Sequence, residues 1–289
     1  MANPTKARDE FVEVNGLRFH YRESGDPRSR HALILLHGYA ATADIWTDVA
    51  SDLAREFRVI ALDQRGYGQT DRAEDMDYTR ATQLEDLEGV IEALGLRSVT
   101  LVGHSMGGAL ALCYAAEHPE VTTALVVVEA APEVLRSGVE NLRRLLTAGE
   151  SWGSLEEAME AMRPHLPNTS NEQLERRVRA AITTAEDGGF TWDFDEAFRD
   201  PQIRPPEPDP GQRRLNDLWD SADRVQCPTM IVRGQDTDML TPEAIQRLHR
   251  RIAGSRVSLI EDAGHNVPSD QPASLALNIR EFLQSIAAI

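Results

Sequence analysis

The stretch Ser98-Val-Thr-Leu-Val-Gly-His-Ser105-Met-Gly-Gly-Ala-Leu-Ala-Leu112 decides the fold. Its first part, Ser98–Val102, is a compact apolar run of the kind found in strands buried on both faces of a parallel sheet. From Met106 onward the spacing predicts a helix that ends before Pro119, because proline disfavours the helical conformation of the preceding residue. Between strand and helix lies the pattern Gly-x-Ser-x-Gly, which predicts a sharp turn that exposes Ser105.

The chemistry expected of this turn is nucleophilic. Gly103, Gly107 and Gly108 are small enough to let the two chain segments approach closely. The turn sets the Ser105 hydroxyl at the N-terminus of the helix, where free N–H groups and the helix dipole favour negative charge. The alternative is a glycine-rich turn with an incidental serine, but the flanking strand and helix favour a catalytic serine.

Working outward, strand-like runs alternate with helical patterns. Apolar spacing predicts helices around residues 45–57 and 84–94. Two further runs, Glu10–Val14 and Leu17–Glu23, predict a hairpin around Asn15-Gly16. The alternation predicts a doubly wound α/β sheet. The runs expected to form its strands are Ala32–Leu36, Arg58–Leu62, Ser98–Val102, Leu125–Val128, Met230–Arg233 and Val257–Ile260.

The alternation breaks after Ala131, where a helical and acidic segment begins. We therefore expect a core domain made of residues 1–131 and 222–289, with residues 132–221 inserted as a helical cap. The cap contains most of the tryptophans and several phenylalanines, which either line an apolar ligand cavity or pack the cap's own small core. These aromatics are Trp152, Phe190, Trp192, Phe194, Phe198 and Trp219.

A serine hydroxyl needs a base to act as a nucleophile at neutral pH. Of the eight histidines, only His265 lies in a loop after the last predicted strand, where it can reach the strand ends at which Ser105 must lie. His37 and His104 flank the turn motifs and are expected to be buried packing groups. The alternative for His265 is a solvated surface histidine.

The segment Leu35-Leu-His-Gly-Tyr39 is a candidate for part of the oxyanion hole. It leads out of the run Ala32–Leu36, which is the third predicted strand when the two strands of the hairpin are counted. In a turn of this type one donor is the backbone N–H of the residue after the nucleophile, here Met106. The second comes from the loop after the third strand, here Tyr39. An ordinary strand-ending turn is the alternative interpretation of this loop.

The bulk properties exclude several classes of protein. With 41% hydrophobic and 27% charged residues, the 289-residue chain has ample material for a core, and no apolar run is long enough to span a membrane. The net charge of −17 argues against nucleic-acid binding and disfavours multiply anionic substrates. The two cysteines form no metal or disulfide pattern, so we expect a cytoplasmic protein that needs no metal or organic cofactor.

These residues resemble the α/β-hydrolase fold family from about Phe11 to Phe282. The motifs occur in that family's order: His37-Gly38, Asp63-Gln-Arg-Gly66-Tyr-Gly68, Gly103-His-Ser-Met-Gly107, Asp238-Met-Leu-Thr-Pro242 and Gly264-His265. The resemblance implies a serine hydrolase of the esterase or lactonase kind, with the inserted cap roofing the active site. It also implies the chain order nucleophile, acid, histidine.

Three carboxylates are candidates for the acid that orients His265. Asp238 matches the family's signature best and closely precedes Thr241-Pro242, which predicts a helix start. Asp236 lies nearer the strand end. Glu129, after the run Leu125–Val128, is an outside candidate because some family members place the acid there. The predicted triad is therefore Ser105, Asp238 and His265.

The expected reaction is hydrolysis of a small-molecule carboxylic ester or lactone through an acyl-enzyme. The same triad would also serve carbon–carbon bond hydrolysis or cofactor-free perhydrolysis. Two further alternatives are a slow-turnover ligand receptor and a scaffold with an inactive site. Acyl-chain length and oligomeric state are left open.

Overall fold

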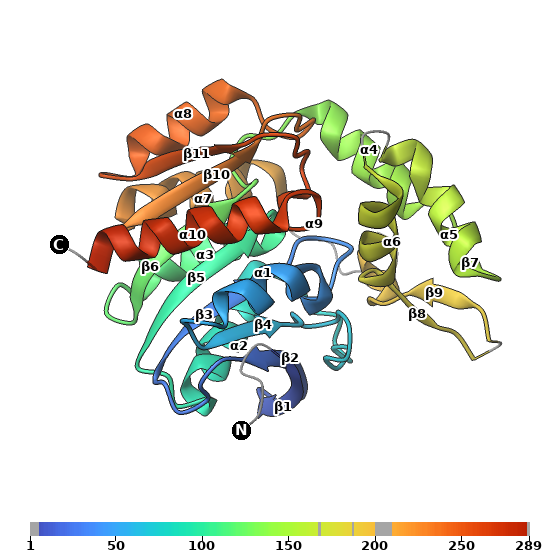
Figure 1. Cartoon of the computed structure of the whole chain (residues 1–289), viewed down its shortest axis with the longest axis horizontal. Helices are drawn as coiled ribbons and strands as arrows, with labels where there is room; N and C mark the ends of the chain where they lie inside the picture. The colour runs from blue at the N-terminus through green and yellow to red at the C-terminus, as the bar shows by residue number, and fades with distance from the viewer. Residues whose placement is uncertain (1–5, 167–168, 187, 200–209, 288–289) are drawn as a thin grey trace.

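The structure is a computed structural model of the chain and describes residues 6–166, 169–186, 188–199 and 210–287 (Figure 1). Its centre is an eight-stranded sheet with the order β1-β2-β4-β3-β5-β6-β10-β11. The strands are β1 (Arg8–Val14), β2 (Leu17–Ser24), β3 (His31–Leu36), β4 (Val59–Leu62), β5 (Ser98–His104), β6 (Thr122–Val128), β10 (Thr229–Gly234) and β11 (Arg256–Ile260). The predicted α/β-hydrolase fold is confirmed.

The first two strands form the predicted antiparallel hairpin, and the strands from β4 to β11 run parallel to one another. Asn15 and Gly16 both have positive φ, at 51° and 79°. That is the conformation a two-residue hairpin turn requires, and asparagine and glycine adopt it most readily. The sheet is therefore mostly parallel, with an antiparallel pair at one edge.

Helices cover both faces of the sheet and create two apolar cores. Because side chains alternate along a strand, Leu33 and Leu35 pack on one face while Ile34 and Leu36 pack on the other. The first face is covered by α1 (Thr47–Leu53) and α10 (Pro272–Ala287). The second is covered by α2 (Arg80–Ala93), α3 (Met106–Glu117), α7 (Pro210–Arg224) and α8 (Pro242–Arg251). Short segments η1 (Ala43–Trp46) and α9 (Val267–Asp270) complete the core.

The inserted segment forms a separate cap beside the carboxyl ends of the strands (Figure 1). It contains α4 (Arg136–Leu146), α5 (Leu155–Met162), η2 (Arg163–His165), α6 (Asn171–Arg179) and η3 (Glu196–Phe198). It is not purely helical, because β7 (Ser151–Trp152), β9 (Phe190–Trp192) and β8 (Ile182–Thr184) form a small antiparallel sheet. The expected boundary at residue 221 falls inside α7, whose Leu218 and Ala222 pack into the core beside α3.

The cap is attached to the core at the loop that follows β4. The backbone N–H of Gly68 donates to the Asp193 carbonyl at 2.8 Å, and the N–H of Asp195 donates to the Gly66 carbonyl at 2.8 Å. Tyr67 forms an isolated bridge with Phe194 between these two bonds. The loop and the cap segment 193–195 are therefore joined by main-chain hydrogen bonds, together with side-chain contacts such as Tyr67 with Phe194 and Arg72 with Asp193.

Within the described ranges, every helix is too short or too polar to cross a membrane.

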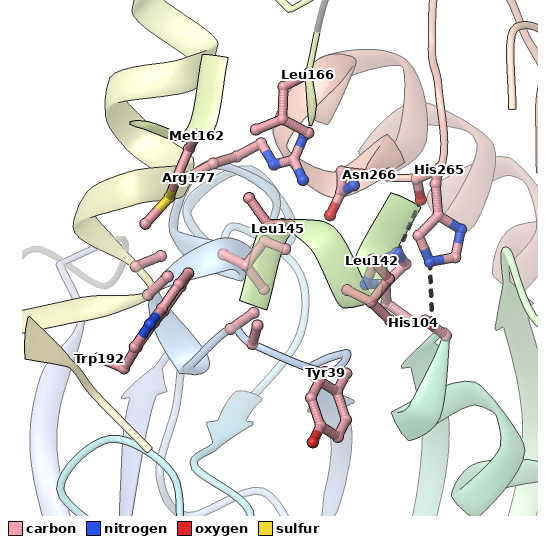
Figure 2. A pocket seen from close by; sticks show the side chains of 16 residues that line it. Tyr39, His104, Leu142, Leu145, Met162, Leu166, Arg177, Trp192, His265 and Asn266 are labelled. Carbon is pink, nitrogen blue, oxygen red and sulfur yellow. Dashed lines mark hydrogen bonds between the residues drawn. The ribbon is translucent and has the colours of Figure 1, made fainter. Parts of the chain in front are cut away.

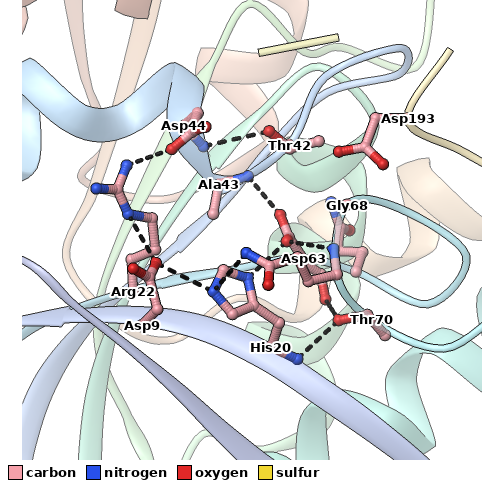
Figure 3. A network of polar contacts seen from close by, with 12 residues as sticks. Asp9, His20, Arg22, Thr42, Ala43, Asp44, Asp63, Gly68, Thr70 and Asp193 are labelled. Carbon is pink, nitrogen blue, oxygen red and sulfur yellow. Dashed lines mark hydrogen bonds and ion pairs between the residues drawn. The ribbon is translucent and has the colours of Figure 1, made fainter. Parts of the chain in front are cut away.

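A buried network around Asp63 holds this loop in place (Figure 3). The Asp63 carboxylate accepts hydrogen bonds from His20 Nδ1 at 2.7 Å, from the Ala43 N–H at 2.6 Å and from the Gln69 N–H at 3.0 Å. Gly68 has a φ of 54°, and a Cβ there would lie 2.1 Å from an Asp63 oxygen. Only glycine therefore fits at position 68.

His20 and Asp63 shift each other's pKa in opposite directions. Burial alone would lower the pKa of His20, but the hydrogen bond and the charge of Asp63 outweigh burial and raise it above 6.5. Burial alone would raise the pKa of Asp63, but the His20 hydrogen bond and the nearby charges lower it below 3.8. The charged pair therefore exists across the whole range between these two values.

This pair makes the stability of the protein depend on pH. A histidine whose pKa is raised on folding adds stability that is complete below its unfolded pKa and is lost as the pH rises through its folded pKa. We expect His20→Asn, which keeps a hydrogen-bond donor but cannot titrate, to lower the free energy of unfolding by roughly 1–3 kcal/mol at about pH 6. The deficit should shrink as the pH rises through the folded pKa of His20, as measured by urea unfolding of both proteins at a series of pH values above 6.5. A deficit that stays constant between these pH values would contradict the assignment.

Candidate active site

The backbone at Ser105 has the strained geometry of a nucleophile turn. Ser105 has a φ of 53° and a ψ of −114°, which is rare for a residue other than glycine. It directly precedes α3, so its side chain lies at the N-terminus of a helix. The strain is the cost of exposing the hydroxyl at the end of β5, and such strain is concentrated at functional sites.

Glycines on either side of Ser105 make this turn possible. A Cβ on Gly103 would lie 2.2 Å from the Gly107 carbonyl oxygen, and one on Gly107 would lie 2.4 Å from the Leu36 carbonyl oxygen. Gly38 is equally confined, because its Cβ would lie 2.7 Å from His104 Nδ1 and 3.2 Å from Ser105 Cβ. The loop after β3 therefore packs directly against the nucleophile turn.

Ser105 and His265 are brought together as the sequence predicts. The distance between Ser105 Oγ and His265 Nε2 is 3.0 Å, and the opposite ring nitrogen, Nδ1, lies 3.0 Å from Glu129 Oε2. Because a carboxylate oxygen accepts hydrogen bonds, Nδ1 donates its proton to Glu129 and Nε2 is left to accept the proton of the Ser105 hydroxyl. This is the tautomer that a general base requires.

The fixed position of Glu129 follows from the strand register. Val128 pairs with Val232, so Glu129 begins the loop at the carboxyl end of β6 beside the end of β10. Its side chain is fully buried and accepts two further hydrogen bonds, from the Gly234 N–H and the Thr237 hydroxyl, both at 2.7 Å. Three donors therefore hold this carboxylate in one orientation.

The predicted contact between Asp238 and His265 is not present, and this is the main correction to the sequence-based site. Asp238 is exposed, and among the described residues its carboxylate accepts a hydrogen bond from Asn141 of α4 at 3.3 Å. Asp236 is exposed as well. The Thr237 hydroxyl between them is bonded to Glu129, and so the acid that contacts the imidazole is Glu129 and neither aspartate.

Two further histidines are buried and neutral, and one of them is bonded to the His265 backbone. Burial holds the pKa of His104 well below 6.5, and its Nε2 donates to the His265 carbonyl oxygen at 2.8 Å. Burial also lowers the pKa of His37, which donates from Nδ1 to the Gly38 carbonyl and accepts from the Gln64 N–H. His104 thus holds the His265 backbone, while His37 supports the loop after β3.

The two residues predicted to form the oxyanion hole both lie close to the nucleophile. Met106 is the first residue of α3, and Tyr39 lines the same cavity as Ser105. Gly38 brings the Tyr39 loop into contact with the Ser105 side chain. This placement is compatible with backbone donors at both positions.

A cavity of about 50 Å³ lies between the cap and the core and contains Ser105 and His265 (Figure 2). A larger cavity of about 260 Å³ adjoins it. The residues that line both are Leu142, Leu145, Leu166, Arg177, His265 and Asn266. We call the smaller one, which contains Ser105, the inner cavity and the larger one the outer cavity. The inner cavity is mostly apolar, which suits the acyl or alcohol part of a small organic substrate.

The cap aromatics mostly pack against one another instead of lining this cavity. Trp152, Phe194 and Phe198 are buried in an apolar cluster that the cap shares with the loop after β4, where Tyr67 and Tyr78 contact Phe198. Phe190 packs against that cluster, and Trp219 packs against the core of the main domain. Of the predicted aromatics, Trp192 alone is among the described residues that line the inner cavity. Aliphatic side chains from the cap form most of the opposite wall.

The family model of the alpha/beta hydrolase fold matches residues 31–272. The chain therefore belongs to the α/β-hydrolase fold family, as its sheet order and nucleophile turn indicate. On this fold Ser105, His265 and Glu129 form a row of hydrogen-bonded side chains at the carboxyl ends of the strands.

Individual proteins similar to this chain include several ester hydrolases. The chain is 27% identical to an esterase of Mycobacterium tuberculosis over 88% of this chain and 83% of that protein. It is 26% identical to a human monoacylglycerol lipase over 96% of this chain and 82% of that protein. The crystal structure of an alpha/beta hydrolase from Novosphingobium aromaticivorans has a TM-score of 0.84 and 26% identity, covering 96% of this chain and 98% of that one.

Proposed function

We propose that this protein hydrolyses a small-molecule carboxylic ester or lactone, with Ser105 as nucleophile, His265 as general base and Glu129 as the acid that orients the base. The observation that carries the proposal is the continuous chain of hydrogen bonds from Ser105 through His265 to Glu129, with both distances at 3.0 Å. The esterase and lipase activities named for the relatives support an ester substrate.

The reaction follows from this geometry. Ser105 Oγ attacks the carbonyl carbon while His265 Nε2 takes the hydroxyl proton, and Glu129 stabilises the imidazolium that forms. The N–H groups of Tyr39 and Met106 bind the oxyanion, and each such donor is typically worth about 2.7–4 kcal/mol in the transition state. His265 then gives its proton to the departing alcohol, and water cleaves the acyl-enzyme by the reverse path.

A fluorophosphonate probe tests this proposal directly, since it reacts with activated serines. We expect labelling at one site, located by mass spectrometry on the peptide that contains Ser105, and loss of labelling in Ser105→Ala. We also expect steady multiple turnover on p-nitrophenyl esters of short acids, which a slow-turnover receptor would not show. Absence of labelling together with absence of turnover would overturn the proposal, and labelling of another serine would overturn the assignment of Ser105.

A substrate panel separates the rival reactions. We expect turnover of esters or lactones to be faster than cleavage of a carbon–carbon bond in a diketone. We also expect it to be faster than peracid formation from hydrogen peroxide. The reverse order would assign the triad to one of those reactions.

A further inference from the structure

Arg177 is the feature of the cavity that ester hydrolysis alone does not use. It lies on α6, whose outer residues Arg176 and Arg179 form ion pairs with exposed carboxylates, at 3.1 Å to Asp48 and 2.8 Å to Glu175. Arg177 instead lies on the inner face of α6 and lines both cavities. In Figure 2 its guanidinium extends toward Leu166 and Asn266, on the cap side of the cavity that holds His265.

The guanidinium of Arg177 has no direct partner among the described residues. Burial lowers the pKa of Arg177 to about 10, while Asp270 and Asp238 oppose this shift only as nearby charges. Arg177 therefore keeps its positive charge at neutral pH. The side chain is half-buried at the wall of the cavity, and a partly desolvated cation that lacks a hydrogen-bonded counter-charge is stabilised when an anion binds beside it.

The charges of the two cavities differ in a way that indicates where an anion would bind. Four aspartates line the outer cavity, namely Asp236, Asp238, Asp262 and Asp270. The described residues that line the inner cavity include no aspartate or glutamate, and Arg177 is the permanently charged side chain among them. A substrate anion would therefore be attracted to the inner cavity, beside Ser105, and repelled from the outer one.

We propose that Arg177 binds a carboxylate of the substrate in the inner cavity, so that the preferred substrates are esters that carry one free carboxylate a few bonds from the scissile bond. This inference rests on the proposed function, since it concerns the cavity of Ser105 and His265. A guanidinium binds a carboxylate through two parallel charge-assisted hydrogen bonds, which fixes the orientation of the ligand as well as adding affinity.

The net charge of −17 is compatible with this preference. The field of the whole molecule disfavours anions, and it does so increasingly with each added charge. One carboxylate matches one guanidinium at short range, where a buried site is screened least. We therefore expect a single carboxylate to be favoured over a neutral group, while multiply anionic substrates stay disfavoured as the net charge predicts.

Matched substrate pairs test the inference. Monoethyl glutarate is compared with its primary amide, ethyl glutaramate, so that a carboxylate on the acyl side is replaced by a neutral group of the same shape. The acetate ester of 4-hydroxybutyrate is compared with that of 4-hydroxybutyramide, which places the carboxylate on the alcohol side. The measured quantity is the ratio of kcat/KM for the anionic over the neutral member of each pair.

We expect this ratio to exceed one in at least one pair and to fall about 10–100-fold in Arg177→Gln, the size of a lost charge-assisted pair of hydrogen bonds. Arg177→Lys should recover part of the ratio, because it keeps the charge without the planar fork. Arg176→Gln, one residue away on the outer face, is the control and should leave the ratio unchanged. A fall of less than about fivefold for both pairs in Arg177→Gln would overturn the inference, since it is smaller than the loss of one such bond.

A second measurement separates substrate binding from a purely structural role. If Arg177 mainly stabilises the fold through Asp270, Arg177→Met should lower the Tm by more than about 5 °C, as breaking a buried pair does. Such a fall would count against the inference. If Arg177 is held ready for a ligand, the Tm should fall by less than this or should rise.

The two proposals also fail separately. Ester turnover that depends on Ser105 but shows no effect of Arg177 on the ratio sinks only this inference. Turnover that does not depend on Ser105 sinks the proposed function.

Discussion

Ser105→Ala is expected to lower kcat for ester hydrolysis by about a millionfold, the loss found when the nucleophile of a comparable triad is removed. The reason is that no acyl-enzyme can form without the Ser105 hydroxyl. The remaining oxyanion donors and the cavity should still accelerate attack by water by about 10³–10⁴-fold over the uncatalysed rate. The measurement is single-turnover and steady-state hydrolysis of a p-nitrophenyl ester.

The control for this variant is Ser51→Ala, which removes an exposed hydroxyl from α1, on the opposite face of the sheet from α3. It should keep the kcat of the unmodified enzyme. Circular dichroism and Tm should show that Ser105→Ala remains folded, since alanine fits wherever the serine side chain does. Undiminished rates in Ser105→Ala would assign the hydrolysis to another group.

Glu129→Gln should have the second-largest effect, a loss of about 10⁴ in kcat, as in a related triad whose acid was replaced by its amide. The new amide would present either an N–H or an oxygen to His265 Nδ1, and the N–H orientation puts the imidazole proton on Nε2, where it blocks the base. Asp238→Asn and Asp236→Asn are the matched controls and should change kcat by less than about threefold, because both side chains are exposed.

Comparing the losses in kcat among the Glu129, Asp238 and Asp236 variants decides which carboxylate orients His265. A larger loss in Asp238→Asn than in Glu129→Gln would mean that the loop after β10 rearranges to bring Asp238 to His265 during turnover. The stability of Glu129→Gln should be measured alongside, because Gly234 and Thr237 donate to the carboxylate and lose charge-assisted bonds in the variant.

The sheet and the nucleophile turn could be predicted from sequence because local patterns determine them. The buried parallel strands are uninterrupted apolar runs, and the turn at Ser105 needs glycines at fixed offsets. His265 could be found as well, because its place after the last strand is a matter of chain order. In each case the information lies within a short stretch of the chain.

The acid could not be chosen in the same way because its position depends on a long-range register. Glu129 and Asp238 both follow strands of the sheet, at β6 and β10, so chain order favours neither. What decides between them is that Thr237 turns inward to Glu129, which leaves Asp238 on the surface. A signal was present in the sequence, since Glu129 is a lone carboxylate directly after the apolar run Leu125–Val128.

The inward orientation of the Arg177 side chain could not be predicted from the sequence either. Residues 172–179 form a charged helical pattern in which any of the arginines could face the solvent. The rotation of this helix about its axis is fixed by Leu174 and Val178, whose side chains are buried in the cap. As a result Gln173 faces the core domain, where its side chain donates to the Asp270 carbonyl at 2.6 Å. Arg177 lies one turn after Gln173 and so points the same way.

The attachment of the cap at residues 193–195 has a consequence for how this enzyme could be re-engineered. Because main-chain atoms of Gly66 and Gly68 pair with those of Asp195 and Asp193, the junction works like an added strand, which side-chain contacts such as the hydrogen bond from the Tyr78 hydroxyl to Asp195 reinforce. A foreign segment grafted into the cap between α4 and α7 should dock if it supplies an extended tripeptide at that place that ends in an aspartate. We therefore expect the cap segment between α4 and α7 to be exchangeable, so that substrate specificity can be changed while Ser105, His265 and Glu129 remain untouched.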